Sequence, residues 1–228
     1  MLNITHQLTD FLNTLIYDRD LIVFEKKRLA LIGISLNNSY FTESKLTTIL
    51  TGFSHHFEQV KVVLADSIAI HNYKALGYSN GKAQKKVKKH TNQMSNRIIR
   101  SMNCIKQENI SLIFWQEIEA FPGYADGLSK VCWLYENNSD FLADVHTTTI
   151  KVMNKHMTEP AQKWSILQEA KWYLLKELAL AYCAPDFFST SLLTCYYQDF
   201  PIYRKMLHGH YTGIPVKNHG FLAYEALV

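Results

Sequence analysis

Residues 28–35 read RLALIGIS, an apolar run that ends at a serine. Two runs of the same kind follow, VKVVLAD over residues 60–66 and ISLIFW over residues 110–115. Short runs rich in Leu, Ile and Val are typical of strands that are buried on both faces of a sheet. Longer amphipathic stretches separate these runs, so strands and helices alternate along the chain. This alternation predicts an α/β protein with a parallel sheet flanked by helices.

The length and composition indicate one globular unit. The 228 residues are 47% hydrophobic and contain no repeat or Pro/Gly-rich linker, so we expect a single domain over residues 1–228. No apolar run approaches the ~20 residues that a membrane-spanning helix needs. Residues 1–20 lack a basic region and include acids, which argues against a signal peptide. The four scattered cysteines favour reduced thiols over disulfides or zinc. We therefore expect a cytoplasmic protein without metal or membrane segment.

The positive charge of the chain is concentrated in one segment. No acidic residue occurs between Asp66 and Glu108, and this stretch carries nine lysines and arginines. Because the whole chain has a net charge of +4, the remainder carries −5 (4 minus 9). Such an asymmetry indicates a polyanionic partner. Seven of the nine lie on a helix expected from Ser79 to about Lys106: Lys82, Lys85, Lys86, Lys88, Lys89, Arg97 and Arg100.

This basic helix admits three interpretations. Lysines on a helix most often form a solvated surface. Here, however, seven cations have no acid to pair them, and each like pair repels by roughly 0.2–0.5 kcal/mol. The phosphates of a nucleic acid would remove that repulsion. A membrane surface would do the same, but the narrow apolar stripe from Val87 to Ile105 suits packing on the sheet better than entering lipid. Nucleic acid is the favoured partner.

Ser35 stands at the carboxyl end of the first expected strand, ahead of LNNSYF at residues 36–41. In open α/β sheets, ligands bind beyond the carboxyl ends of the strands. Position alone would still assign Ser35 to a turn. The segment is not a G-x-S-x-G elbow, and no Ser, Asp and His order can be assigned with the ten dispersed histidines.

Tyr173 and Glu177 lie four residues apart on a second long helix, expected from Thr158 to about Cys183. Glu177 falls in an apolar stripe, where a carboxylate needs a partner, water or a proton. The pair makes either a structural contact in the core or a receptor for the ammonium group of a small substrate. The local sequence leaves both interpretations open.

Residues 193–201, LTCYYQDFP, predict a short strand that ends in a loop. Adjacent residues of a strand point to opposite faces. One of Tyr196 and Tyr197 would then face the core and the other a pocket.

Taken together, these segments resemble the cyclodipeptide synthases, whose Rossmann-like fold is similar to the catalytic domain of class I tyrosyl- and tryptophanyl-tRNA synthetases. The similarity rests on GIS-x-x-NSYF at residues 33–41, on Tyr-x-x-x-Glu at residues 173–177, and on Cys195-Tyr196 ahead of Pro201. The basic helix falls where the family carries its tRNA-binding residues. Asn38 and Gln198 indicate the asparagine/tyrosine/glutamine subfamily.

The resemblance implies an aminoacyltransferase that uses two aminoacyl-tRNAs per product and needs neither ATP nor a cofactor. Ser35 would form an aminoacyl-enzyme and then a dipeptidyl-enzyme, from which a diketopiperazine is released. Tyr173 and Glu177 would hold the α-amino group, and Tyr196, or Tyr197 in its place, would move protons. The family suggests a monomer.

The implied pocket is uncharged and mostly apolar. Such a lining favours leucine, phenylalanine or methionine, and cyclo(Leu-Leu) is the expected product. The residues expected to contact the substrate are Leu31, Gly33, Asn38, Val63, Ala65, Leu180, Cys195, Tyr197 and Gln198.

Two other classes of function compete with this hypothesis. A tRNA-binding module that has lost its chemistry would leave Ser35 as a turn residue, and a serine esterase would use it on small esters. The presence of Ser35, Tyr173, Glu177 and Tyr196 together argues against the first. The lack of an elbow and a triad argues against the second.

Overall fold

The computed structural model describes residue 26 and residues 28–153, 163–214 and 216–224. Five strands form one sheet in the order β3-β2-β1-β4-β5, and every neighbouring pair is parallel. The strands are β1 (Leu29–Ser35), β2 (Gln59–Ala65), β3 (Ile110–Phe114), β4 (Leu192–Tyr196) and β5 (His219–Ala223). The predicted α/β architecture with a parallel sheet is confirmed.

The first four strands lie within a residue or two of the predicted runs, and β5 was not predicted. Its sequence, HGFLA, is short and begins with a histidine and a glycine, so it lacks the long apolar signal of a buried strand. It is nevertheless buried, because β4 pairs with it through five residues. The pairing partner, rather than local propensity, makes this segment a strand.

Helices connect the strands. They are α3 (Glu43–His56), α4 (Ala69–Ala75), α5 (Asn80–Ile105), α6 (Trp115–Glu119), α7 (Pro122–Asn137), α8 (Ser139–Met153), α9 (Lys163–Phe188) and α10 (Pro201–Leu207). The predicted basic helix is confirmed as α5, and it ends at Lys106 in the left-handed conformation. The predicted start of the second helix at Thr158 lies outside the described residues. That helix, α9, continues past Cys183 to Phe188 with Pro185 inside it.

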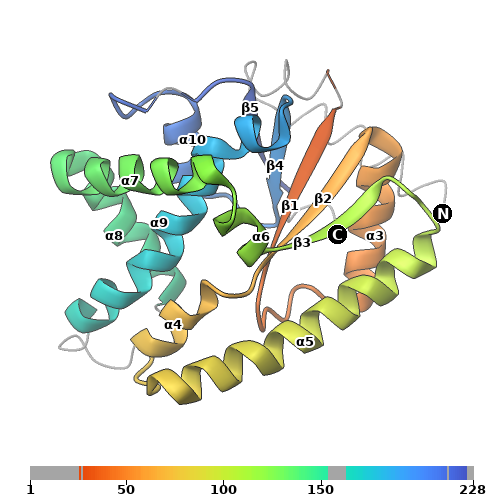
Figure 1. Ribbon diagram of the computed structural model, residues 1–228, viewed down its shortest axis with the longest axis horizontal. Coiled ribbons are helices and arrows are strands. Elements are labelled where there is room, and N and C mark those ends of the chain that lie inside the picture. Colours follow the sequence, from red (N-terminus) through yellow and green to blue (C-terminus); the bar gives the residue numbers. More distant parts are fainter. Residues whose placement is uncertain (1–25, 27, 154–162, 215, 225–228) are drawn as a thin grey trace.

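Two helical layers cover the two faces of the sheet (Figure 1). Side chains alternate along β1. Leu29 and Leu31 point into one core layer, called the first core layer, while Ala30, Ile32 and Ile34 point into the second core layer on the other face. Helices α3 and α5 pack on the second of these faces, and α7, α8, α9 and α10 contribute to the core on the first. In Figure 1, α5 is one long helix along the lower edge of the molecule, with α4 beside its amino end.

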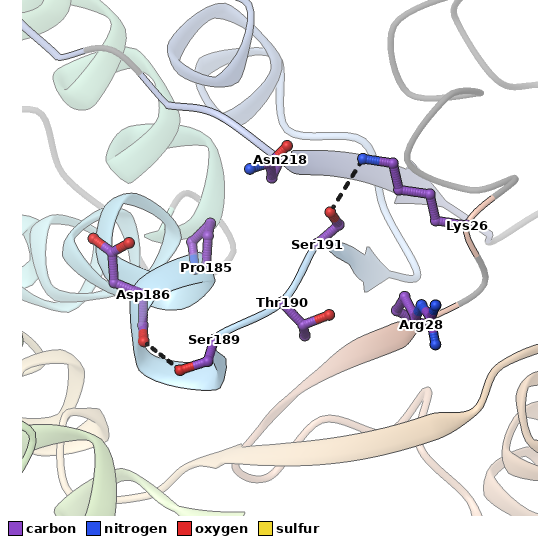
Figure 2. A pocket seen from close by; sticks show the side chains of 8 residues that line it. All are labelled: Lys26, Arg28, Pro185, Asp186, Ser189, Thr190, Ser191 and Asn218. Atoms are coloured by element: carbon purple, nitrogen blue, oxygen red, sulfur yellow. Dashed lines mark hydrogen bonds between the residues drawn. The ribbon is translucent and has the colours of Figure 1, made fainter.

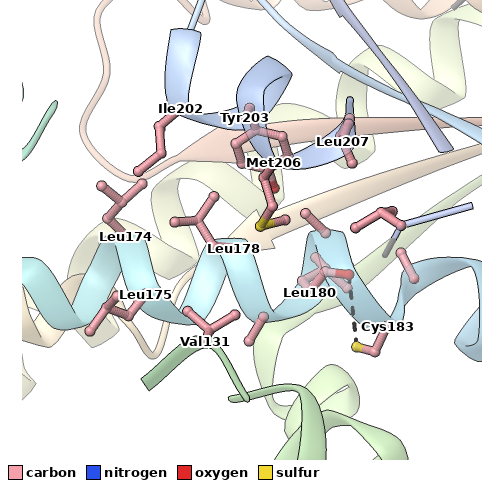
Figure 3. Close-up of a cluster of buried hydrophobic side chains, with 14 of the residues drawn as sticks. Val131, Leu174, Leu175, Leu178, Leu180, Cys183, Ile202, Tyr203, Met206 and Leu207 are labelled. Atoms are coloured by element: carbon pink, nitrogen blue, oxygen red, sulfur yellow. Dashed lines mark hydrogen bonds between the residues drawn. The ribbon is translucent and has the colours of Figure 1, made fainter. Parts of the chain in front are cut away.

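Helix α9 is buried in the middle of the first layer. Figure 3 shows its leucines between α10 on one side and Val131 of α7 on the other. Gly127 of α7 permits a close approach to α9, because a Cβ at that position would come within 3.3 Å of the carbonyl oxygen of Ala179. This packing holds Tyr173 and Glu177 in fixed positions relative to the sheet.

The strand order places a topological switch point at β1. From β1 the chain builds β2 and β3 on one side, and it later returns to build β4 and β5 on the other side. Helices therefore leave the carboxyl ends of β1 and β4 in different directions, which opens a crevice between those two ends. Ser35 ends β1 and Tyr196 ends β4. No helix in the described part of the chain is long and apolar enough to cross a membrane.

Candidate active site

Ser35 makes two side-chain contacts at the switch point. Its Oγ lies 3.2 Å from the hydroxyl oxygen of Tyr196, and Asn38 Nδ2 donates a hydrogen bond to it at 3.1 Å. Since the Asn38 amide can only donate through nitrogen, the Ser35 proton is free to point at the tyrosine. The serine is thus oriented by an amide on one side and joined to a phenol on the other.

The loop after β1 positions Asn38. Asn37 takes the left-handed conformation, with φ of 54°, and this turns the chain back on itself. Asn38 Oδ1 then accepts a hydrogen bond from the backbone N–H of Tyr40 at 3.0 Å, which fixes the direction of its amide nitrogen. Arg97 of α5 holds the end of the loop, because its Nη1 donates to the carbonyl oxygen of Phe41 at 2.6 Å.

The two adjacent tyrosines have different partners. Tyr196 contacts Ser35 and packs its ring over Gly33, where an added Cβ would lie 3.4 Å from the ring. The Tyr197 hydroxyl instead accepts a hydrogen bond from Asn38 Nδ2 at 3.1 Å. The Tyr197 ring stacks on that of Tyr40, with 4.2 Å between the ring centres. Burial, and then the neighbouring Tyr197 and Glu177, raise the pKa of Tyr196 well above its ordinary value. Its hydroxyl is neutral at any physiological pH, so it can pass a proton but cannot act as a phenolate base.

Tyr173 and Glu177 of α9 lie near Tyr196, because each is close enough to interact with it electrostatically. Tyr173 packs against the first core layer, and its buried hydroxyl makes no hydrogen bond of standard geometry to another described residue. Burial raises the pKa of Glu177 to about 8, and interaction with the Tyr173 phenol opposes this rise. Burial and the nearby Glu177 in turn raise the pKa of Tyr173. A carboxyl group with these surroundings gains strongly from a cationic partner such as an ammonium group.

Most of the predicted pocket residues lie together. The side chains of Leu31, Val63, Ala65 and Leu180 belong to the first core layer, on the same face of the sheet as Tyr196 and Gly33. The strand register explains the grouping, because Gly33 pairs with Val63 and Ser35 with Ala65. These apolar side chains line the floor below Ser35.

Cys195 does not join this group. It points to the opposite face of the sheet, in the second core layer, where it is fully buried. Since adjacent residues alternate faces, a strand that turns Tyr196 toward Gly33 must turn Cys195 away. The prediction that Cys195 contacts the substrate therefore disagrees with the strand geometry. Gln198 is partly exposed and makes no hydrogen bond to another described residue.

The cations of α5 separate into two sets. Lys82, Lys85, Lys88 and Lys89 are exposed, while the ammonium group of Lys86 lies 4.7 Å from the centre of the Tyr78 ring. The two arginines have protein partners. Arg97 holds the loop end described above, and Arg100 Nε forms an ion pair with Glu43 at 2.8 Å. The four exposed lysines are thus accessible to a ligand, whereas the arginines tie α5 to the segment that follows Ser35.

Tyr40 is a supporting residue that the sequence analysis did not single out. Its ring stacks on Tyr197, and the Lys45 ammonium group lies 4.2 Å from the centre of the Tyr40 ring. Its place inside the NSYF motif was the available signal, but an aromatic residue beside a turn gives no indication of the distant ring on which it stacks.

A groove lies at the other end of the sheet (Figure 2). It has a volume of about 540 Å³ and is lined by Lys26, Arg28, Pro185, Asp186, Ser189, Thr190, Ser191 and Asn218. Arg28 precedes β1, so the seven residues of that strand, about 20 Å, separate the groove from Ser35. The groove is not part of the candidate active site. Among the described residues, no cluster of His, Cys, Asp or Glu is arranged to hold a metal ion.

Comparison with known proteins places this chain in the class of aminoacyltransferases that use aminoacyl-tRNA. The chain belongs to the cyclodipeptide synthase family, whose model matches residues 19–225.

Individual relatives agree with this assignment. The chain is 27% identical over 189 residues to cyclo(L-leucyl-L-phenylalanyl) synthase of Streptomyces noursei, covering 81% of this chain and 79% of the relative. It is 37% identical over 71 residues to cyclo(L-leucyl-L-leucyl) synthase of Bacillus subtilis, covering 31% of this chain and 29% of the relative.

The solved structures support the fold. A crystal structure of cyclo(L-leucyl-L-phenylalanyl) synthase superposes with a TM-score of 0.78 at 24% identity, covering 91% of this chain and 94% of the other. A Mycobacterium tuberculosis protein, described as relating cyclodipeptide synthetases to type I tRNA synthetases, superposes with a TM-score of 0.76 at 21% identity, covering 91% and 89%.

Proposed function

We propose that this protein makes cyclodipeptides by a ping-pong reaction through Ser35, and that it belongs to the asparagine/tyrosine/glutamine subfamily. The observation that carries the proposal is the hydrogen-bonded set formed by Ser35, Asn38 and Tyr196 at the switch point. An aminoacyl ester is already an activated electrophile, so correct positioning of a serine hydroxyl contributes much of what the reaction needs.

In the first step Ser35 Oγ attacks the carbonyl carbon of an aminoacyl-tRNA. The bond from that carbon to the ribose oxygen breaks, and the ribose oxygen receives the Ser35 proton through the Tyr196 hydroxyl. The product is an aminoacyl ester on Ser35, and the first tRNA leaves. Asn38 supports this step by donating to Ser35 Oγ, which directs its lone pairs and its proton.

In the second step the amine of the enzyme-bound aminoacyl group attacks the ester carbonyl of a second aminoacyl-tRNA. The bond from that carbon to the ribose oxygen breaks, the ribose oxygen takes up the proton that the attacking nitrogen loses, and the second tRNA leaves. This direction of attack is required for a dipeptidyl-enzyme, because attack by the second tRNA's amine on the Ser35 ester would instead release a dipeptidyl-tRNA. Glu177 holds the α-ammonium group and accepts its proton before the attack. A pKa of about 8 suits a base that works near neutral pH.

In the last step the free amine of the dipeptide attacks the ester carbonyl on Ser35. The six-membered diketopiperazine forms, the carbon–oxygen bond to Ser35 breaks, and the proton that the attacking nitrogen loses passes through the Tyr196 hydroxyl to Ser35 Oγ. All energy comes from the two tRNA esters, so the reaction uses neither ATP nor a cofactor.

The apolar floor below Ser35 supports a leucine-like first substrate. Leu31, Val63 and Leu180 are uncharged and pack together in the first core layer. The relatives named as making cyclo(L-leucyl-L-phenylalanine) and cyclo(L-leucyl-L-leucine) favour the same class. Cyclo(Leu-Leu) is the proposed main product. Mixed products are expected beside it, since one methylene changes binding by only about 1–3 kcal/mol.

Expression in bacteria followed by mass spectrometry of the medium tests the proposal. The wild-type protein should release leucine-containing diketopiperazines, and Ser35→Ala should release none. Ser39→Ala is a matched control, because it removes a hydroxyl from the same loop without touching the reacting oxygen. Product from Ser35→Ala at the wild-type level, or the absence of any diketopiperazine from the wild type, would show that the proposal is wrong.

A further inference from the structure

A second groove lies beyond the carboxyl end of β2, between α4 and α5. Its volume is about 310 Å³, at the lower end of the range for small-ligand sites. One wall is the turn from β2 into α4 and the other is one face of α5. The lining residues are Asp66, Ser67, Ile70, Gln84, Val87, Lys88, Thr91 and Asn92.

The groove begins next to the reacting serine. Ser35 pairs with Ala65 across neighbouring strands, and Asp66 is the first residue after β2. Adjacent strands lie about 4.8 Å apart and consecutive Cα atoms about 3.8 Å apart, so the Cα atoms of Ser35 and Asp66 are within about 9 Å of each other. A group bonded directly to the ester that reacts at Ser35 can therefore reach this groove.

Several polar groups of the groove lack protein partners. Ser67 Oγ and Thr91 Oγ1 are both buried, and neither makes a hydrogen bond to another described residue. Most buried polar groups in folded proteins have a hydrogen-bond partner, so two buried hydroxyls without one at a single groove are unusual. Rotation about the Cα–Cβ bond would turn each hydroxyl toward the groove.

The remaining lining is suited to a nucleoside. Asp66 uses one carboxylate oxygen to accept from the backbone N–H of Trp115 at 2.9 Å, which leaves the other available to accept from ribose hydroxyls. The side-chain amides of Gln84 and Asn92 can both donate and accept, as the edge of a nucleobase requires. Val87 provides an apolar surface for the face of a base.

We infer that this groove binds the terminal adenosine of the aminoacyl-tRNA, while Lys88 contacts the phosphate that precedes it. This inference rests on the proposed function, because that adenosine carries the ester which reacts at Ser35. The groove joins the reacting carbonyl to the exposed lysines of α5. It holds the ribose close to Ser35 whichever amino acid the tRNA carries.

A binding experiment tests the groove without any chemistry. The trinucleotide cytidyl-cytidyl-adenosine should bind the wild-type protein in a calorimetric or NMR titration. Asn92→Trp, which fills the groove from an exposed position, should weaken that binding at least tenfold. Asn103→Trp should bind as the wild type does, because it makes the same change 11 residues, about 16 Å, further along α5. Equal affinities in all three proteins would overturn the inference.

Two further comparisons sharpen the result. Adenosine monophosphate carries the adenosine and the phosphate that the groove and Lys88 contact, so it should displace the trinucleotide; failure to displace it would contradict the adenosine assignment. A full tRNA should bind more tightly than adenosine monophosphate because it also reaches the exposed lysines of α5, and equal affinities would mean that the groove takes a free nucleotide instead. Thr91→Val keeps the shape of the side chain and removes only the hydroxyl, so it reports on the groove even if Asn92→Trp does not fold. It should weaken trinucleotide binding several-fold, and unchanged binding in this variant would contradict a role for the hydroxyl.

The rate of Ser35 acylation distinguishes failure of the groove from failure of the proposed function. Intact-protein mass spectrometry can follow acylation by leucyl-tRNA and by leucine cyanomethyl ester, which has no nucleoside. The ratio of the two rates should fall about tenfold in Asn92→Trp. An unchanged ratio overturns the nucleoside assignment. If neither donor acylates wild-type Ser35, the proposed function fails, and the trinucleotide titration still decides whether the groove binds the tRNA end.

Discussion

At the scale of single residues, Glu177 combines an ionisable carboxyl group with apolar surroundings. Burial raises its pKa from 4.5 to about 8. Between these values the folded protein keeps a proton that the unfolded chain has lost, so stability should fall as pH rises from about 4.5 to 8. Glu177→Gln removes this titration and should flatten the profile. The difference should reach at most about 5 kcal/mol, and contact of the carboxyl group with water should make it smaller.

Urea unfolding of both proteins at pH 5, 7 and 9 measures this difference. The free energy of unfolding of the wild type should drop relative to Glu177→Gln as pH rises. Parallel profiles would contradict the raised pKa. The same variant should lose most diketopiperazine formation, since a neutral amide neither pairs with an ammonium group nor accepts its proton.

Tyr196 and Tyr197 are adjacent in sequence, but only one has a direct contact with Ser35. Tyr196→Phe removes the hydroxyl 3.2 Å from Ser35 Oγ and should slow acylation about 100-fold, the lower range for a lost proton-transfer group. Tyr197→Phe removes only a partner of Asn38 and should slow it about tenfold or less. Single-turnover acylation with leucyl-tRNA measures both. A larger defect in Tyr197→Phe would assign the proton relay to Tyr197 instead.

At the scale of elements, His219 connects β5 to β4 and α9. Its Nδ1 lies 2.8 Å from the carbonyl oxygen of Ala181 and must donate to it, so the proton of the neutral ring is on Nδ1. Its Nε2 then accepts from the Thr194 hydroxyl at 2.7 Å. One imidazole thus satisfies two buried groups on two other elements.

The same histidine should make the protein sensitive to acid. Burial lowers the pKa of His219 to about 4, below its ordinary 6.5. The unfolded chain gains a proton first as pH falls, so stability should be lost between about pH 6.5 and 4, by up to about 3 kcal/mol. His219→Phe should be less stable at pH 7, because Thr194 and Ala181 lose their partner, but its profile over that range should be flatter. Thermal unfolding at pH 7, 5.5 and 4.5 tests this, and equal acid sensitivity in the two proteins would contradict it.

At the scale of the whole molecule, charge is divided between α5 and the rest of the chain. The exposed lysines should bind tRNA phosphates and release counterions, so affinity should fall steeply with salt. Lys85→Gln with Lys89→Gln should reduce the slope of log affinity against log salt by about one to two. Lys151→Gln with Lys217→Gln makes the same charge change at exposed positions outside α5 and should leave the slope unchanged. Filter binding across a salt series measures it, and equal slopes for the two pairs would remove α5 from tRNA binding.

The amino-acid sequence by itself determined the α/β class, the first four strands and α5, because these depend on local apolar runs and helical spacing. The motif around Ser35 and the pair of Tyr173 and Glu177 were also evident, since the residues of each group are near one another in the chain. The strand β5 was not predicted from the sequence, because its burial depends on pairing with β4.

Only the tertiary structure decided which of these residues meet. It brought Tyr196 to Ser35 from 161 positions away in the chain, and it turned Cys195 to the opposite face of the sheet. It also placed Asp66 and α5 on two sides of one groove. Contacts between distant segments depend on strand order and register. Those are set by packing of the whole chain, and no local pattern of residues specifies them.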